Sequence, residues 1–199
     1  MKITGVKVYD LHESIVTSGL PKLAEYTPEK FEREVETMQN EVHVENNPHF
    51  KRACRLAAAP DGSGHKTFLS GILVSANVTA TNAWWLQFGR YHYQQIVSSQ
   101  SKMHCLKSML EKHSEGHSLF NMKVQNDFIK SLKALENEDE ETLVYNCPVG
   151  LELTARITTN YLQLRTIWVQ RRNHKLKEWH DFCGWIERLP FAKQLIVCS

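Results

Sequence analysis

The chain has 199 residues, of which 42% are hydrophobic and 23% charged, and its formal net charge is +2. This length suits one domain with a substantial core, and the composition excludes long disordered segments. The small net charge makes no case for nucleic-acid binding, and no apolar run approaches the roughly 20 residues of a membrane span. Because the N-terminus lacks the apolar core of a secretory signal, a cytoplasmic location is expected.

The first half of the chain predicts helices between strands. Residues 3–11 alternate apolar and polar side chains, as a short strand does. Residues 27–43 and 47–59 each begin with a capping Thr or Asn followed by proline, which is typical of a helix start. Residues 60–64 form a Pro- and Gly-containing loop, and the β-branched, apolar run 68–79 predicts one or two buried strands.

The second half is predicted to be largely helical. Capping residues and periodicity predict helices over residues 82–91, 101–113, 119–135, about 151–172 and 174–189, the last stopped by Pro190. The acidic run Glu136 to Glu141 is interpreted as a solvated turn and helix start. These elements predict an α+β fold, in which a helix-rich single domain over residues 1–199 contains a small antiparallel sheet.

The cysteines and histidines do not predict a metal site. The five cysteines are scattered and form no C-x-x-C pair, which argues against a disulfide framework and against structural zinc. His113 and His117 have a spacing that can bind metal on a helix, but Gly116 lies between them and no acidic or thiol partner is near. We therefore expect no bound metal.

The predicted helix 151–172 carries an apolar stripe and an opposite face. At 100° per residue the stripe, interpreted as core, consists of Leu153, Ile157, Tyr161, Leu164 and Trp168. The opposite face carries Arg156, Asn160, Gln163, Ile167 and Arg171. Asn160 and Arg171 return to nearly the same angle and lie roughly 16 Å apart along the axis. An amide and two guanidiniums in a row suit an elongated anionic ligand, although an ordinary solvated face has the same pattern.

The segment 152–174 (ELTARITTNYLQLRTIWVQRRNH) resembles the C-terminal signature of the flavin-dependent thymidylate synthases. In that signature a Thr-Asn-Tyr-like start is followed by an arginine eleven residues on, and then by a histidine. Asn160, Arg171 and His174 match these landmarks. The resemblance implies that Asn160 and His174 belong to a flavin site and that Arg171 binds deoxyuridylate. One residue is missing between Arg171 and His174, so Arg172 is an alternative for the arginine.

Two earlier blocks are similar to family motifs that precede the signature. The run RACRLAA (residues 52–58) resembles the family's Arg-Ala-Ala-Arg helix. Gly64 to Phe68 resembles its Gly-His-Glu-Thr-Pro-Phe turn, whose threonine approaches FAD, and this implies a flavin contact for Thr67.

Two middle blocks are similar to the motifs around the nucleotide. The run WWLQFGRYH falls where the family has Gln-Trp-Phe-Arg-His-Arg, which implies a nucleotide contact for Gln87 and FAD contacts for Arg90 and His92. The run SSQSKMH falls at Asn-Glu-x-Ser-x-Arg-Tyr. Ser101 matches the serine near the reacting uracil carbon, and Ser99 or Gln100 takes the place of the glutamate. Ser101 and Arg171 are the expected catalytic pair.

Several arginines of the family pattern are absent. The corresponding positions hold Tyr91, Met103, Val144 and Leu162. Each lost guanidinium removes a charge-assisted bond to phosphate worth on the order of 1.5–3 kcal/mol. The basic residues available to replace them are Lys102, Lys107, Arg165 and Arg172. The altered pattern makes a different nucleotide, or a different fate of the transferred carbon, a reasonable consequence.

The resemblance implies an enzyme that transfers one carbon from methylene-tetrahydrofolate to C5 of a pyrimidine deoxynucleotide. Reduced FAD supplies the hydride and NADPH the reducing equivalents, so no protein cysteine need attack the base. It also implies a homotetramer with shared active sites; neither nucleic acid nor a membrane is expected as a partner. Three hypotheses follow: a thymidylate synthase that converts dUMP to dTMP, a hydroxymethylase acting on dUMP or dCMP, and a non-catalytic nucleotide-binding protein that has lost FAD.

Overall fold

The computed structural model describes residues 1–114 and 118–198, which group into two compact units. Unit 1 comprises Met1–Gly5 and Ala76–Ile157, and unit 2 comprises Val6–Ser75 and Thr158–Ser199. His117, which was considered as a metal ligand, lies outside the described residues.

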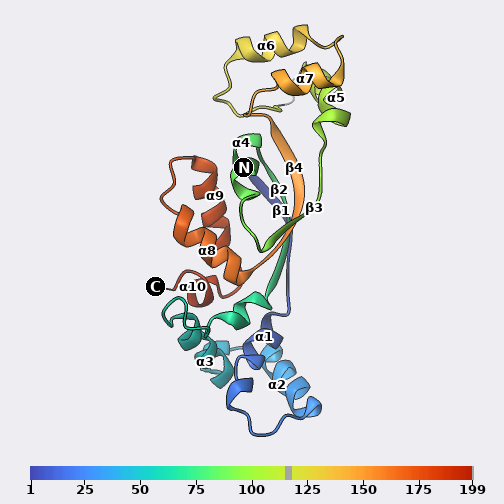
Figure 1. Cartoon of the computed structure of the whole chain (residues 1–199). Helices are drawn as coiled ribbons and strands as arrows, with labels where there is room; N and C mark the ends of the chain where they lie inside the picture. The colour runs from blue at the N-terminus through green and yellow to red at the C-terminus, as the bar shows by residue number, and fades with distance from the viewer. Residues whose placement is uncertain (115–117, 199) are drawn as a thin grey trace. The chain divides into compact units, whose positions relative to one another are not determined.

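A four-stranded antiparallel sheet contains the strands in the order β1-β2-β4-β3 (Figure 1). Its strands are β1 (Lys2–Tyr9), β2 (Leu73–Thr81), β3 (Gln94–Ser99) and β4 (Glu152–Asn160). Within unit 1 the hydroxyls of Thr79 and Thr154 lie 2.8 Å apart, and within unit 2 those of Ser75 and Thr158 lie 3.0 Å apart. The helix-rich α+β class with a small antiparallel sheet is therefore confirmed.

The predicted helix over residues 151–172 is wrong in its first half, because Glu152–Asn160 is strand β4. Its buried residues alternate strictly: Leu153, Ala155, Ile157 and Thr159. Leu153 and Ile157 are four residues apart, a spacing that satisfies a strand of period two as well as a helix. The deciding residue is Ala155, which a helix would turn away from both but which is 3% exposed.

Unit 1 packs helices around an apolar core of its own. They include α4 (Asn82–Phe88), α5 (Lys102–Ser114), α6 (Asn126–Ala134) and α7 (Glu140–Asn146). Helix α4 begins where predicted, since the Thr81 hydroxyl accepts a hydrogen bond from the Trp84 N–H. Helices α5 and α7 pack together over a buried cluster of Leu106, Met109, Leu110, Phe120, Ile129, Leu132, Leu143, Leu151 and Leu153.

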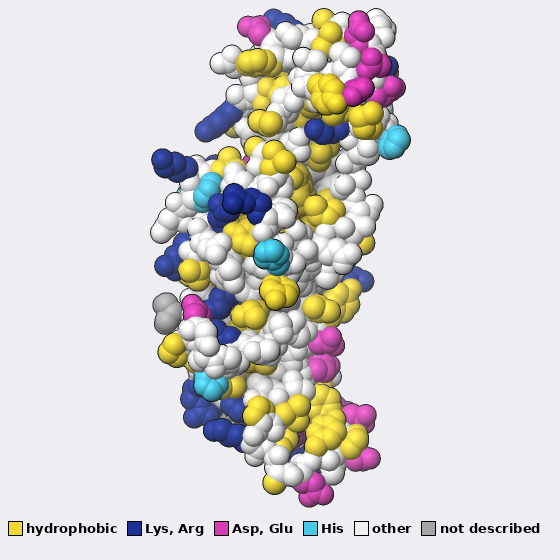
Figure 2. Space-filling view, in the orientation of Figure 1, with side chains coloured by type: hydrophobic (Ala, Val, Ile, Leu, Met, Phe, Trp, Pro, Cys, Tyr) yellow, Lys and Arg dark blue, Asp and Glu magenta, His cyan; other side chains and the backbone are white. Residues whose placement is uncertain are grey.

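The predicted helix over residues 119–135 is only partly correct. Helix α6 begins at Asn126, and Phe120 instead forms an isolated antiparallel bridge with Leu151. The acidic run Glu136 to Glu141 is exposed and forms a turn followed by the start of α7, where Asp139 caps the N–H of Thr142 at 2.7 Å, as predicted. Acidic side chains gather over this part of unit 1 in Figure 2.

Unit 2 contains the remaining described helices. They are α1 (Leu11–Thr17), α2 (Pro28–Asn40), α3 (Pro48–Ala57), α8 (Tyr161–Arg171), α9 (Lys177–Ile186) and α10 (Ala192–Leu195). Short 3-10 helices cover Leu20–Lys22, Val44–Asn46 and Thr67–Ser70. The Asn47 side chain accepts hydrogen bonds from the N–H groups of His49 and Phe50, as its position before Pro48 predicts. The segment Thr67–Ser70, by contrast, is not part of the predicted strand 68–79.

Neither a membrane-spanning helix nor a metal-binding cluster is present among the described residues. Over residues 1–114 and 118–198, no helix has both the length and the apolar character needed to cross a membrane. In the same ranges no group of three or more His, Cys, Asp or Glu side chains is placed to hold a metal ion.

Candidate functional site

Asn160 ends β4 and caps α8 in unit 2. Its backbone is extended, and its Oδ1 accepts a 2.8 Å hydrogen bond from the N–H of Gln163. This cap satisfies one of the N–H groups that the start of a helix leaves without a partner. The side-chain oxygen is therefore committed to the helix, and the amide NH₂ group is left as a donor for a ligand.

Arg171 and Arg172, the two alternatives for the nucleotide-binding arginine, each lie over a tryptophan ring. The Cζ atom of Arg171 is 4.8 Å from the ring centroid of Trp179, and that of Arg172 is 4.4 Å from the ring of Trp168. Trp179 is fully buried, whereas Trp168 is at the surface and donates to the Glu187 carboxylate at 2.8 Å. Stacking on an aromatic ring fixes the plane of a guanidinium, and a planar guanidinium matches the geometry of an anion such as phosphate or carboxylate. Arg171 has the more rigid support of the two.

His174 is oriented by the connection between α8 and α9. Its Nδ1 accepts a 3.0 Å hydrogen bond from the Leu176 N–H, and its ring lies edge-on to Trp179 at 6.3 Å between centroids. Partial burial, assisted by the positive charge of Arg171 and by His180, lowers the pKa of His174 from its ordinary value. With Nδ1 as an acceptor, the neutral ring carries its proton on Nε2, which makes that atom a hydrogen-bond donor.

Thr67 is exposed at the start of its 3-10 helix, where its hydroxyl donates a 2.7 Å hydrogen bond to the Gly64 carbonyl. Lys66 precedes it and is buried, and its ammonium is hydrogen-bonded to the Asp61 carboxylate. Arg165, also largely buried, brings its Nε to 3.8 Å from the same carboxylate. Lys66, and to a smaller extent Arg165, holds the pKa of Asp61 below its ordinary value.

Lys66 is a residue that the sequence analysis missed. The only signal was the replacement of the family's glutamate in the Gly-His-Glu-Thr-Pro-Phe turn by a lysine, which reverses the charge at that position. Its pairing with Asp61 and its approach to Arg165 of α8 depend on the folded chain.

Three predicted site residues of unit 1 lie in and after α4. Gln87 is on the last turn of α4 and is half-buried, and its carbonyl accepts a hydrogen bond from the N–H of Arg90. Arg90 and His92 follow on the exposed segment that leads to β3. Neither side chain forms a hydrogen bond or an ion pair with another described residue.

The other three lie where β3 ends and α5 begins. Ser99 is the last residue of β3 and is exposed. Gln100 extends the pairing with β4, since its N–H donates to the Thr154 carbonyl at 3.0 Å and its Oε1 accepts from the Thr154 N–H at 2.8 Å. The Ser101 carbonyl accepts the first α5 hydrogen bond, from Cys105. The Gln100 side-chain oxygen is thus engaged by the sheet.

The predicted site residues fall into two groups, one in each unit. Unit 2 holds Thr67, Asn160, Arg171 and His174, and unit 1 holds Gln87, Arg90, His92, Ser99, Gln100 and Ser101. In unit 2, Arg171 and His174 both contact the ring of Trp179, while Asn160 and Arg171 are at opposite ends of α8, roughly 16 Å apart at 1.5 Å per residue.

The continuous polar face predicted for residues 156–171 is wrong. Arg156 is on β4, where its Nη1 donates to the Gly5 carbonyl and to Asn77 Oδ1 at 3.3 and 3.0 Å. Gln163 and Ile167 are buried in the α8 packing. The strand and the helix have different side-chain periods, so a single face cannot continue through the junction at Asn160.

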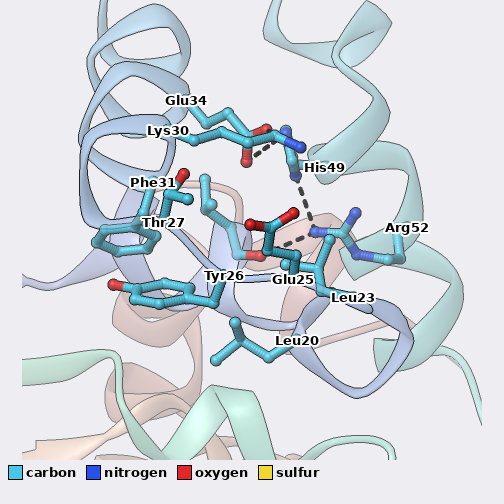
Figure 3. A pocket seen from close by; sticks show the side chains of 12 residues that line it. Leu20, Leu23, Glu25, Tyr26, Thr27, Lys30, Phe31, Glu34, His49 and Arg52 are labelled. Carbon is cyan, nitrogen blue, oxygen red and sulfur yellow. Dashed lines mark hydrogen bonds and ion pairs between the residues drawn. The ribbon is translucent and has the colours of Figure 1, made fainter.

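The family-like Arg-Ala-Cys-Arg run lies on α3, beside a cavity of about 70 Å³ in unit 2 (Figure 3). The Arg52 guanidinium donates to the carbonyl of Val16 at 3.0 Å, to the hydroxyl of Ser18 at 3.2 Å and to Nδ1 of His49 at 2.9 Å. The guanidinium is packed so closely against Gly19 that a Cβ there would lie 2.7 Å from its Cζ. Arg52 therefore joins α3 to the end of α1.

Comparison with known structures reveals close similarity in fold. No protein-family model matches the sequence, and no curated protein is significantly similar to it. The structure of flavin-dependent thymidylate synthase ThyX from Helicobacter pylori complexed with FAD and dUMP matches with a TM-score of 0.73 and 12% identity, over 100% of this chain and 99% of that one. The chain has the fold of a flavin-dependent thymidylate synthase.

Two further structures agree with this assignment. A second Helicobacter pylori ThyX structure with FAD and dUMP has a TM-score of 0.63 at 14% identity, over 88% of this chain and 96% of that chain. A UMP/dUMP methylase, PolB from Streptomyces cacaoi, bound with 5-Br dUMP, has a TM-score of 0.61 at 12% identity, over 99% and 93% of the two chains. The chain thus shares its fold with all three structures at sequence identities of 12%, 14% and 12%.

Two of the four positions at which the family pattern would have an arginine hold apolar side chains that are at least partly buried. Val144 packs against the core of unit 1, and Leu162 is half-buried on α8. Among the basic residues that were candidates to replace the absent arginines, Lys107 pairs with Glu140 at 3.7 Å and Arg172 stacks on Trp168. Arg165 is the candidate that is buried beside the turn carrying Thr67.

Proposed function

We propose that the protein is a flavin- and folate-dependent enzyme that transfers one carbon to C5 of a pyrimidine deoxynucleotide, with conversion of dUMP to dTMP as its reaction. The observation that carries the proposal is the full-length match to a thymidylate synthase structure containing FAD and dUMP. A fold alone does not specify chemistry, so the proposal also depends on whether the side chains suit these ligands.

The donors of unit 2 suit a flavin, whose ring system and diphosphate offer mainly acceptors. Asn160 offers its amide NH₂ beyond the α8 cap, and His174 offers Nε2–H. Thr67 directly follows Lys66, whose side chain is buried. In unit 1, Arg90 and His92 are exposed and have no side-chain partner among the described residues. Neutral donors and cations of this kind match the hydrogen-bond acceptors and the negative charge of FAD.

Arg171 is proposed to bind the anionic groups of the nucleotide, together with Gln87, Ser99, Gln100 and Ser101. The stacking of Arg171 on Trp179 fixes its guanidinium before the ligand arrives, which reduces the entropy lost on binding. Ser101 supplies a hydroxyl that donates to or accepts from the pyrimidine. The protein's contribution is to orient the base and stabilise charge on it, and Arg171 stabilises negative charge that develops on the pyrimidine carbonyl.

When bound, reduced FAD supplies the hydride, methylene-tetrahydrofolate the carbon, and NADPH restores the reduced flavin. Three of the free cysteines are poor nucleophiles, because burial raises the pKa of Cys54, Cys147 and Cys183, the last to about 11. A chemistry without a protein thiolate suits this chain. We also propose that the protein is a homotetramer in which subunits share active sites.

A hydroxymethylase acting on dUMP or dCMP is the second candidate. The observation in its favour is Gln100, which with Ser99 is one of two residues that take the place of the family's glutamate, and whose side-chain oxygen accepts a hydrogen bond from the Thr154 N–H. A neutral amide held in this way changes the hydrogen bonds offered to the base, and with them the choice of nucleotide or the fate of the carbon.

Flavin binding and product analysis test the proposal together. Purified protein is expected to retain or take up FAD, and incubation with dUMP, methylene-tetrahydrofolate and NADPH is expected to yield dTMP. A hydroxymethylated product would favour the second candidate. A protein that neither takes up FAD nor forms either product would contradict both and favour a non-catalytic nucleotide-binding role.

Two variants test the placement of the nucleotide. Arg171→Ala is expected to weaken dUMP binding by roughly tenfold or more, since one charge-assisted contact is lost. Arg172→Ala is the matched control, because it removes the neighbouring stacked guanidinium, and it is expected to leave binding within about twofold. The reverse order of the two effects would assign the nucleotide to Arg172.

A further inference from the structure

Two buried cations of unit 2 share a single carboxylate. The Lys66 side chain is 9% exposed and the Arg165 side chain 11%, whereas the side chain of their partner Asp61 is 78% exposed. Within the described residues Asp61 is the one carboxylate that pairs with either cation, so two largely buried positive charges share a single negative charge, which is unfavourable in a poorly solvated site. A bound anion would supply the second negative charge.

Arg165 is only partly satisfied by its surroundings. Its Nη1 donates to the carbonyls of Ile196 and Cys198 at 2.8 and 2.9 Å, which holds the end of the chain. Its Nε is buried without a hydrogen bond in the described part of the chain, because Asp61 is 3.8 Å away. A ligand oxygen closer than the Asp61 carboxylate would satisfy this donor.

The carboxylate belongs to an exposed loop that contains two glycines. Gly62 and Gly64, which follow Asp61 in this loop, have positive φ angles of 84° and 75°. A Cβ atom added at either glycine would have no neighbouring atom within 4 Å. Open space and glycine conformational freedom allow Asp61 to leave without disturbing packed side chains.

The two cations lie where the family-like pattern has changed its charges. Lys66 replaces the glutamate of the turn and precedes Thr67, the expected FAD contact. Arg165 is three residues after Leu162, where an arginine is missing, and residues three apart share one side of a helix. Helix α8 packs on the 3-10 helix that begins at Thr67, so both cations belong to the same region of unit 2.

We infer that Lys66 and Arg165 form a phosphate-binding site, and that Asp61 is an internal counter-ion that a phosphate ester displaces. A phosphate carries about two negative charges and therefore neutralises both cations, whereas Asp61 neutralises one. It also supplies several strong acceptor oxygens for the ammonium and for the unsatisfied Nε. The identity of the ester, as the FAD diphosphate or the nucleotide monophosphate, rests on the proposed function, but the phosphate chemistry rests on these residues.

Asp61→Asn and Lys66→Gln test the site in the full chain. Binding is measured by calorimetry at constant ionic strength with pyrophosphate, FAD, riboflavin, dUMP and deoxyuridine. Asp61→Asn is expected to tighten phosphate-bearing ligands by roughly tenfold, because the competing carboxylate is gone. Lys66→Gln is expected to weaken them by roughly tenfold or more. Riboflavin and deoxyuridine, which lack phosphate, are expected to bind all variants equally.

The exposed Lys51→Gln on α3 is the control for loss of one positive charge, and circular dichroism checks folding. Arg165 is left unchanged because it also holds the carbonyls of Ile196 and Cys198. If Lys66→Gln does not fold, Asp61→Asn decides alone, since unchanged affinity for every phosphate ligand would overturn the inference. Affinities in both variants within about twofold of Lys51→Gln would do the same.

The ligand series separates this inference from the proposed function. An effect confined to FAD, or to dUMP, identifies which phosphate the site holds. Pyrophosphate binding that depends on Lys66, without binding of FAD or dUMP, would support the phosphate site and contradict the proposed function. If the protein turns over dUMP and neither variant changes ligand affinity, the result would support the proposed function and contradict the phosphate-binding site.

Discussion

His174 accepts a hydrogen bond at Nδ1 from the N–H of Leu176, and its carbonyl accepts one from Nε2 of His180 at 2.6 Å. Protonating the ring would replace the Nδ1 acceptor with a donor and break the bond to Leu176. Arg171, which shares the Trp179 ring with His174, opposes a second positive charge nearby. The neutral Nε2–H form is thus stabilised by geometry and by charge.

We expect the pKa of His174 to lie below its ordinary value of 6.5, with the neutral ring in the Nε2–H tautomer. The folded-state pKa is lowered, so the stabilising contribution of this group is fully present above the unfolded value and is lost as the pH falls through the folded value. Proton–nitrogen NMR correlation gives both the midpoint and the tautomer. Arg171→Gln should raise the midpoint, and a wild-type midpoint above 6.5 would refute the argument.

Single residues also show why the sequence suggested Thr67 but not Lys66. Thr67 was identified because it matches the threonine of the family's turn motif. Lys66 does not match that motif, and the mismatch indicates only that the family's glutamate is absent. Its partner Asp61 is five residues away, but Arg165 is 99 residues away along the chain. The role of Lys66 therefore depends on Arg165, which lies near it only in the folded chain.

The junction of β4 and α8 combines a strand end, a helix cap and a predicted flavin contact in Asn160. The cap uses Oδ1, and the proposed flavin contact uses the amide NH₂. These two roles use different atoms of one side chain, and a substitution that retains only the oxygens separates them.

Asn160→Asp is expected to keep the stability of the protein, because Asp caps helices as well as Asn does. Asn160→Ala is expected to lower the free energy of unfolding by about 1 kcal/mol. Both variants are expected to weaken FAD binding, since each loses the amide donor. Urea denaturation and flavin fluorescence titration measure the two effects separately. Unchanged FAD affinity in Asn160→Asp would limit the role of Asn160 to capping.

The wrong assignment of residues 152–160 has a physical origin. The sequence features that predict a helix, its caps and its periodicity, lie within the helix and its flanking residues. A strand, by contrast, is stabilised by pairing with residues elsewhere in the sequence. The Thr79–Thr154 hydroxyl pair joins residues 75 positions apart, and no local pattern indicates it. For β3 the local signal is absent as well, since most of its residues are exposed and show no alternation.

Strand β3 is at an edge of the sheet, and unlike an ordinary edge strand it carries exposed apolar residues on both faces. Ile96 is 41% and Val97 57% exposed, and Leu86 and Tyr93, which precede β3, are more exposed still. Exposed apolar edge strands favour association with another chain. In a protein proposed to be a homotetramer, β3 is the natural place for a subunit contact.

Val97→Glu is therefore expected to shift the protein from a tetramer to smaller species, because a buried contact would now contain an unpaired carboxylate. Light scattering after size-exclusion chromatography measures the mass. Val169→Glu, at an exposed valine of α8 in unit 2, is the control and should leave the mass unchanged. A wild-type monomer would contradict the proposed assembly, and an unaffected tetramer would exclude β3 from the contact.

The sequence by itself determined the class of fold, several helix starts and the landmarks of the thymidylate synthase pattern. These depend on short-range features: caps at Asn47 and Thr81, a proline at the first helical position, and motifs read in order along the chain. Only the tertiary structure decided that residues 152–160 form a strand, that Arg171 stacks on Trp179, and that Lys66 and Arg165 share Asp61. Each of these depends on a pairing between groups that the chain brings together only by folding, where long-range packing and charge outweigh local preference.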